Sequence, residues 1–344
     1  MEQNRKGRPV NKAQWNQKLK NYAKPTLWKS IFQMVNTFIP YGVLLWLMYM
    51  TMAWDMPYWV TLLLSLPAAG FLVRIFIIFH DCTHQSFFKS KTANAIVGHI
   101  TGIMTFTPYY TWQWEHNVHH GSVGNLDRRG HGDIWTMTVD EYMGSHWLKK
   151  LWYRIYRHPL MLFAVSPFVL FAVLNRIPLP KAKRKEHISF AVTNISILLM
   201  IVLAWSTYGW VTYLAIQLPI LYFASVAGVW LFFVQHQFEK VYWSKNQEWD
   251  IVKAALEGSS FYKLPAVLEW FTGYIGYHNI HHLNPRIPNY NLKKCYKNIY
   301  ELKQQEPITF FRSFKLAMLK LYDEKSEQMI NFREYRKLKK AVYR

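Results

Sequence analysis

Four apolar segments constrain this chain more than any other feature of its sequence. They cover residues 31–53, 58–79, 188–208 and 210–234, and each holds 21 to 25 residues. A helix rises about 1.5 Å per residue, so each segment is long enough to cross a hydrocarbon core of roughly 30 Å. The sequence therefore predicts an all-α integral membrane fold with four transmembrane helices.

The four segments form two pairs with very short connections. The connection between the first two is AWDMP, and the last two are separated by a Tyr-Gly-Trp turn. Neither contains Lys or Arg, whereas the other connections and both ends of the chain are rich in them. By the positive-inside rule, we expect two helical hairpins in the cell membrane with both termini in the cytosol.

Two shorter apolar runs, residues 95–107 and 159–174, have positive charges on both sides. Because 13 or 16 residues are marginal for crossing a bilayer, we expect them to be interfacial or re-entrant helices. A six-span alternative, in which both runs cross, would separate the histidine motifs described below onto opposite faces.

Basic and apolar stretches divide the chain into three regions. Residues 1–30 are a basic cytosolic arm, residues 31–292 form the membrane domain, and residues 293–344 are a basic cytosolic tail that we expect to be helical from Pro307 onward. A soluble protein with a net charge of +21 often binds nucleic acid, but the apolar segments exclude that class here. Cys82 and Cys295 lie far apart on the expected cytosolic side, so we expect free thiols.

Eight of the 14 histidines fall in three short motifs, HDCTH, HNVHH and HNIHH. The eight are His80 and His84; His116, His119 and His120; and His278, His281 and His282. Residues at i, i+3 and i+4 share one face of a helix, so each motif presents its imidazoles to a common point. Eight neutral nitrogens exceed the ligands of one metal ion and predict a site for two.

The motifs also share a position along the membrane. His80 follows the second apolar segment directly, and the third motif follows the fourth segment after a polar stretch, so a common centre belongs at the cytosolic boundary. His236, just beyond the last span, is a ninth candidate ligand. We expect the remaining histidines to be structural or exposed: His99, His131, His146, His158 and His187.

Imidazole ligands without thiolates suit iron, copper or zinc, so the ligand type alone does not select the metal. The location adds a constraint, because metals at the ends of apolar helices can meet an acyl chain from the bilayer. Unactivated methylenes do not react by acid–base chemistry at neutral pH. A redox metal with dioxygen is therefore the reagent that we expect.

The three motifs in this order, from about residue 36 to 292, resemble the membrane fatty acid desaturase family. The stretches RIFIIFHDCTHQSFF, GDIW and EGSSFYKLP are most similar to bacterial cold-induced acyl-lipid desaturases, including the Δ5 type. The resemblance implies two iron ions, O2 with two electrons, and a cis double bond formed in a phospholipid acyl chain. It also implies that the eight motif histidines and His236 bind the metals. Related acyl-CoA desaturases have an Asn where this chain has Phe232, so coordination near His236 is expected to differ.

No HPGG haem motif occurs in this sequence, so we expect electrons to come from a separate donor. The basic cytosolic face suits a small acidic ferredoxin or flavodoxin, and it equally suits anionic headgroups.

Polar residues near the motifs are candidates for orienting the imidazoles. The first is Asp133 in GDIW, for which a loop or capping role is the alternative. The others are Asp81, Asn279, Glu239, Glu115 and Asn125. Cys82, between two candidate ligands, is either a redox-sensitive thiol or a packed core residue.

Other functions fit parts of the pattern. A histidine-motif fatty acyl hydroxylase or carotenoid oxygenase would use the same metals, and a di-zinc membrane hydrolase or a metal transporter would also cluster histidines. A transporter places polar ligands near the bilayer midplane. Here the spans are nearly free of ionisable residues, with Arg74 as the exception, which favours a reaction site at the interface.

Overall fold

Four long helices form the frame of the computed structural model, which describes residues 12–130 and 132–342. They are α2 (Leu27–Ala53), α3 (Tyr58–Thr83), α9 (Arg184–Tyr208) and α10 (Trp210–His236). All four are long and apolar enough to cross a membrane, as the sequence predicts. Each extends past its apolar segment at the end away from the hairpin connection, so α3 and α10 carry His80 and His236 within their last turns.

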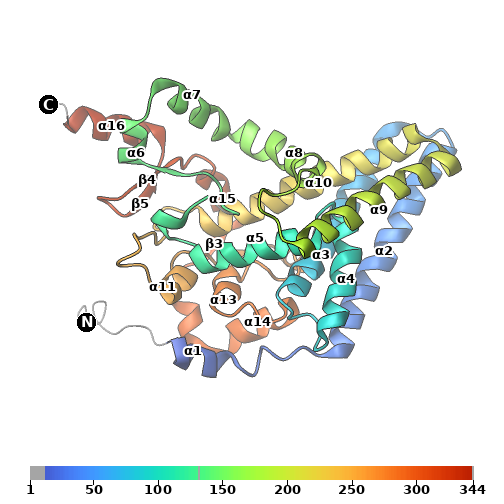
Figure 1. The fold of residues 1–344 in the computed structure, drawn as a ribbon, viewed down its shortest axis with the longest axis horizontal. Helices are drawn as coiled ribbons and strands as arrows, with labels where there is room; N and C mark the ends of the chain where they lie inside the picture. The colour runs from blue at the N-terminus through green and yellow to red at the C-terminus, as the bar shows by residue number, and fades with distance from the viewer. Residues whose placement is uncertain (1–11, 131, 343–344) are drawn as a thin grey trace.

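The two hairpins lie together, with both connections at the same end of the bundle (Figure 1). Helix α3 is the central element, because 61% of its apolar window is buried, against 22% in α2 and in α9 and 33% in α10. Trp46 of α2 and Leu199 of α9 are exposed, which suits contact with lipid. The protein is thus an all-α membrane protein with one protected helix and three that face outward.

The first short apolar run forms α4 (Lys91–Met104), which lies beside α3. The backbone reverses at Phe106, which has a φ of 57°, and continues as α5 (Tyr109–Ser122). Close packing here depends on Gly98, because a Cβ at this position would lie 2.1 Å from the Tyr109 ring. This enter-and-return path delivers the second histidine motif to the same end as the first.

The second short apolar run does not form one continuous helix with the segment before it. Helix α7 (Trp147–Tyr156) is followed by a π-helical turn η2 (Met161–Val165), α8 (Ser166–Ala172) and a 3₁₀ turn η3 (Leu174–Arg176). The two halves of this segment meet at a bend of 56°. Its inner part packs against α10, so it braces the bundle from the side.

A cap of short elements surrounds the other end of the four helices (Figure 1). Its elements are α11 (Ile251–Leu256), α12 (Ala266–Phe271), α13 (His278–Leu283), α14 (Asn289–Asn298), the 3₁₀ turns η1 (Leu126–Arg128) and η4 (Tyr300–Gln304), and α1 (Lys12–Leu19). In α1, Trp15 and Leu19 are buried in one cluster with Ile280 and Leu292. Part of the basic N-terminal region is therefore packed on the element that carries the third motif.

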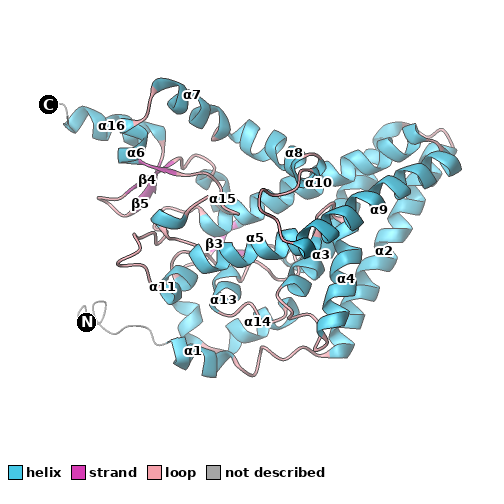
Figure 2. Cartoon of the chain, in the orientation of Figure 1, coloured by secondary structure: helices cyan, strands magenta, loops and turns pink. Residues whose placement is uncertain are grey.

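The prediction of a helical tail from Pro307 onward is wrong. Short strands interrupt it. Strand β3 (Ile308–Thr309) pairs in parallel with β2 (Tyr262–Lys263), and β4 (Leu321–Asp323) pairs with β5 (Gln328–Ile330) and with β1 (Met137–Thr138). Figure 2 shows β4 and β5 together in the cap, with β3 apart from them. The helices beside them are α6 (Val139–Gly144), α15 (Phe310–Leu316) and α16 (Phe332–Val342). The apolar residues Leu316, Leu319 and Tyr322 belong to the main core, so their pattern reflects burial against the domain and not an amphipathic helix.

Candidate metal centre

Four helices bring nine histidines to one place. His80 lies in the last turn of α3 and His84 caps that helix, while His236 is the last residue of α10. Helix α5 carries His116, His119 and His120, and α13 carries His278, His281 and His282. Eight of the nine are buried and His120 is half-buried. The structure thus brings together every histidine that the sequence singles out as a candidate ligand.

Helix α5 is tied to the end of α3 by hydrogen bonds to carbonyls that a helix end leaves without intrahelical partners. The Tyr109 hydroxyl donates to Cys82 O at 2.8 Å, and Gln113 Nε2 donates to Thr83 O at 2.6 Å. Because both bonds fall within the first motif, they hold the first and second motifs against each other.

The histidines form two groups that touch. In the first group, His80, His84, His116, His120 and His281, the candidate ligand atoms all lie within 4.8 Å of one another, and the same is true of His119, His236 and His282. His278 joins the second group, because its Nε2 lies 2.9 Å from His236 Nε2 and 3.0 Å from His282 Nε2. The groups meet where the His120 and His282 rings stack with centroids 4.0 Å apart.

The donor atoms of this cluster fit metal ions. Nε2 of His80 and of His84 is buried without a hydrogen-bond partner in the described part of the chain. Outside the spanning helices, burial and the neighbouring imidazoles lower the pKa of six cluster histidines well below the usual value; they are His84, His116, His120, His278, His281 and His282. Neutral imidazoles keep a lone pair for a metal, and buried nitrogen atoms without partners are costly. The cluster is therefore able to bind a metal.

Two carboxylates touch imidazoles on the side away from the cluster. Asp133 Oδ1 lies 2.7 Å from His119 Nδ1, and Asp81 Oδ1 lies 3.2 Å from His80 Nδ1. Asp81 also accepts a hydrogen bond from the Asn289 amide at 2.7 Å. A carboxylate on Nδ1 favours the tautomer with its proton there, so the Nε2 lone pair faces the cluster.

Gly132 explains how Asp133 reaches α5. Its φ is 66°, a conformation that favours glycine, and a Cβ there would lie 3.3 Å from His119 Cβ. A larger residue at position 132 would hold the loop away from α5. The glycine of GDIW therefore allows the carboxylate of the next residue, Asp133, to contact His119.

The other expected orienting residues make contacts elsewhere in the cap or lie on α5. Asn279 Nδ2 donates to Gln305 Oε1 at 2.5 Å, and Glu239 pairs with Arg312 at 3.3 Å. Asn125 Oδ1 accepts from Asp127 N in a turn, and Glu115 is a half-buried residue of α5 whose pKa is raised by burial. An orienting role for these four residues stays a prediction.

The remaining histidines and the cysteines lie outside the cluster. His99 Nδ1 lies 2.7 Å from Ala95 O, His146 caps α7, and His158 and His187 are exposed. His131 lies outside the described residues. Both cysteines are free and buried.

Trp112, which no sequence motif marks as a functional residue, stacks on His116 with ring centroids 4.1 Å apart. The sequence signal that could have identified Trp112 is its position one helical turn before His116.

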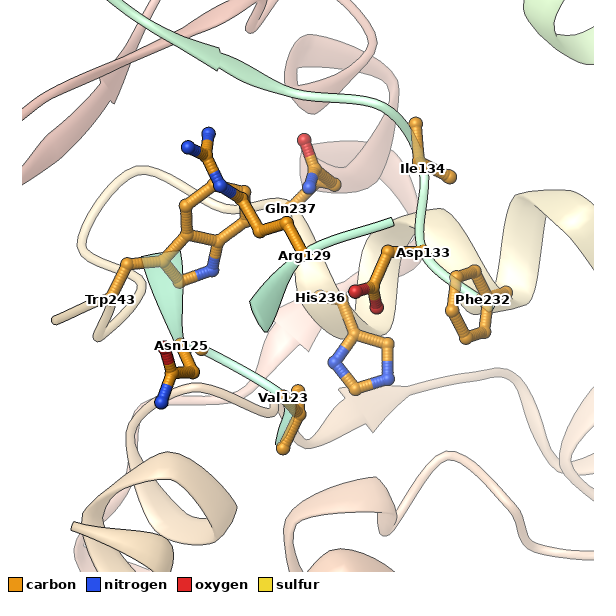
Figure 3. A pocket seen from close by; sticks show the side chains of 10 residues that line it. Val123, Asn125, Arg129, Asp133, Ile134, Phe232, His236, Gln237 and Trp243 are labelled. Atoms are coloured by element: carbon orange, nitrogen blue, oxygen red, sulfur yellow. The ribbon is translucent and has the colours of Figure 1, made fainter. Parts of the chain in front are cut away.

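A small cavity lies beside the second group (Figure 3). Its volume of about 20 Å³ suits roughly one water molecule. Figure 3 shows the Asp133 carboxylate directed toward His236, with the Phe232 ring to one side. The Phe232 centroid lies 4.9 Å from that of His236 and 5.2 Å from that of His119. Phe232 therefore presents an apolar face to the second group.

Comparison with known proteins agrees with this geometry. A family model described as fatty acid desaturase matches residues 56–313. An sn-1 acyl-lipid omega-3 desaturase (ferredoxin) of Synechocystis is 28% identical over 266 residues, covering 70% of this chain and 69% of that protein. An sn-1 oleoyl-lipid 12-desaturase of Picosynechococcus is 27% identical over 246 residues, covering 66% and 65%. A fatty acid desaturase of Bacillus subtilis is 45% identical over 312 residues, covering 91% and 88%. Since the family match spans α3, the second hairpin and all three histidine motifs, this chain belongs to the fatty acid desaturase family and is an oxidoreductase.

Proposed function

We propose that this protein is an O2-dependent acyl-lipid desaturase that forms a cis double bond, at the Δ5 position, in a saturated chain of a phospholipid. The observation that carries the proposal is the convergence of nine histidines, eight of them buried, at one end of four apolar helices. Acyl chains of the surrounding lipid lie against such helices. The cluster therefore lies where an acyl chain can reach it.

Two iron ions are the cofactor that we assign to the two histidine groups. When bound, iron with O2, two electrons and two protons supplies the oxidising power to remove two hydrogen atoms from adjacent methylenes and form two water molecules. The ligand set contains imidazole nitrogens and no thiolate, which suits iron. The division into two touching groups supports two ions and not one.

The chain's own residues would hold and shield the centre. Asp133 and Asp81 keep protons on Nδ1 of His119 and His80, which leaves the opposite nitrogens free to bind. Trp112 and Phe232 lie against His116 and His236, and these apolar rings help to exclude water. A chain held without water near the metals is the condition for selective oxidation.

The electron donor that we propose is a ferredoxin or flavodoxin, and the location is the cell membrane with both termini in the cytosol. The name of the Synechocystis relative includes ferredoxin, which supports this class of donor. The net charge of +21 supports association with a small acidic protein.

Fatty-acid analysis of a desaturase-free bacterial host tests this function. Expression of the chain with a ferredoxin and its reductase should produce cis-Δ5 monounsaturated phospholipid chains in air and none without oxygen, as measured by gas chromatography after derivatisation of the double bond. His120→Ala should abolish the product, while His99→Ala, a change of the same kind outside the cluster, should retain it. Hydroxylated chains, or an unchanged profile with confirmed expression and donor, would contradict the proposal.

A further inference from the structure

We propose that Arg157 is a positioning residue that holds Asp133 and His236 against His119. This inference rests on the proposed metal-binding role of the second histidine group. Arg157 follows α7 and is fully buried, one of the largest side chains in the protein with no exposure.

The Arg157 guanidinium joins three separate segments of the chain. Nη1 donates to Thr136 Oγ1 at 3.0 Å and to Trp135 O at 3.3 Å. Nη2 donates to Gln237 Oε1 at 3.1 Å and to Leu319 O at 2.8 Å. These four acceptors are neutral oxygens, so the contacts fix geometry more than they neutralise charge.

Two of these segments lead directly to the second group. Trp135 lies two residues after Asp133, whose carboxylate contacts His119, and Gln237 is the residue after His236. The hydroxyl of Thr136 also donates to Gln237 Oε1 at 3.2 Å, so the loop and the end of α10 share one hydrogen-bonded junction. His119 Nε2 and His236 Nε2 lie 3.2 Å apart on the inner side of that junction.

The fork shape of arginine is what this junction uses. Nη1 donates hydrogen bonds to the loop, and Nη2 donates to the residue that follows α10 and to the C-terminal segment. The single ammonium of lysine cannot occupy both positions. The third segment adds a buried lysine, because Lys320 Nζ donates to the Arg157 carbonyl at 2.5 Å and to Ala317 O at 2.6 Å. The C-terminal region thereby braces a junction that supports the histidines.

Arg157→Lys tests the inference without depending on metal. Protein in detergent, stripped of metal by a chelator, is labelled with diethyl pyrocarbonate, and each histidine is followed by mass spectrometry. We expect severalfold faster labelling of His119 and His236, with His80 and His84 unchanged. Arg176→Lys is the matched control, because the Arg176 guanidinium also donates to a backbone carbonyl, that of Phe106, away from the cluster.

Iron binding gives a second readout. Loss of orienting groups weakens metal binding by about 10- to 100-fold, so Arg157→Lys should retain less iron per chain than the wild type and Arg176→Lys should not. If Arg157→Lys fails to fold, Thr136→Val, which removes one acceptor with little change in shape, should show the same labelling pattern. Unchanged labelling of His119 and His236 in folded variants would overturn the inference. Altered labelling in a protein whose wild type binds no iron would instead overturn the proposed function and leave the positioning role standing.

Discussion

Asp133 Oδ1 accepts a hydrogen bond from His119 Nδ1 at 2.7 Å, although the two residues are separated by a loop of irregular structure. The Asp133 side chain is 21% exposed, while that of His119 is 1% exposed. This pair therefore links the buried second group to the protein surface.

Replacing the Asp133 carboxylate tests whether its contact with His119 contributes to activity. Asp133→Asn keeps the shape but removes the charge that holds the Nδ1 proton, so we expect activity to fall about 10- to 100-fold. The thermal unfolding temperature should change little, because the side chain is partly exposed. Product formation in membranes measures the effect. Asp140→Asn, at an exposed residue of α6, is the control and should keep its activity; equal activities in the two variants would show that Asp133 does not orient His119.

Close packing of α4 against α5 makes Gly98 sensitive to a single methyl group. In Gly98→Ala the new Cβ would lie 2.1 Å from the Tyr109 ring, so Tyr109, which bonds to Cys82 O, must shift. We expect a loss of about 1–3 kcal/mol in the free energy of unfolding, measured by thermal or denaturant unfolding in detergent. Gly42→Ala, where nothing lies within 4 Å of the Cβ position, is the matched control. Similar stability of the two variants would argue against this helix packing.

Lys320 makes stability depend on pH. Burial, together with the nearby Arg157 charge, lowers the pKa of Lys320 to about 7. An unfolded lysine titrates near 10.4, so between these values the unfolded chain binds the proton more strongly than the folded chain. The free energy of unfolding should therefore rise with pH across this window.

The variant Lys320→Met isolates this contribution. Unfolding of the variant should depend less on pH between about 7 and 10 than unfolding of the wild type, because one titrating group is removed. Lys325→Met, at an exposed turn residue, should keep the wild-type slope. Parallel pH profiles for Lys320→Met and the wild type would show that Lys320 titrates normally in the folded protein.

Labelling of single cysteines tests the orientation in the membrane. Cys82 and Cys295 are buried, so background labelling by a membrane-impermeant maleimide should be low. Asp55→Cys, in the connection between α2 and α3, should react in intact cells, and Lys325→Cys, between β4 and β5, should react after lysis. Labelling of Lys325→Cys in intact cells would reverse the proposed topology.

Local patterns in the sequence predict the membrane frame and the histidine cluster well. Apolar length defines the four spans, and helical spacing explains how His116, His119 and His120 share a face. The convergence of three motifs follows because chemistry requires one centre and both hairpins return to the same end. Span length and helical spacing are features that depend on neighbours within a few residues.

Long-range contacts explain what the sequence did not predict. The pairing of β2 with β3 and the burial of Trp15 beside Ile280 depend on tertiary packing and leave no periodic pattern. Arg157 is similar: in the sequence it is one more basic residue after a basic amphipathic helix, and its role depends on oxygens contributed by residues 135, 237 and 319.

Metal analysis of the purified protein tests the central claim most directly. After expression with sufficient iron and gentle solubilisation, elemental analysis of the wild type should give about two iron ions per chain, as expected for a donor set divided into two groups. His120→Ala, which removes a ligand where the groups meet, should lower this ratio, and His99→Ala should not. Zinc in place of iron, or wild-type and His120→Ala proteins with equal iron, would contradict the assignment of the nine histidines to a di-iron centre.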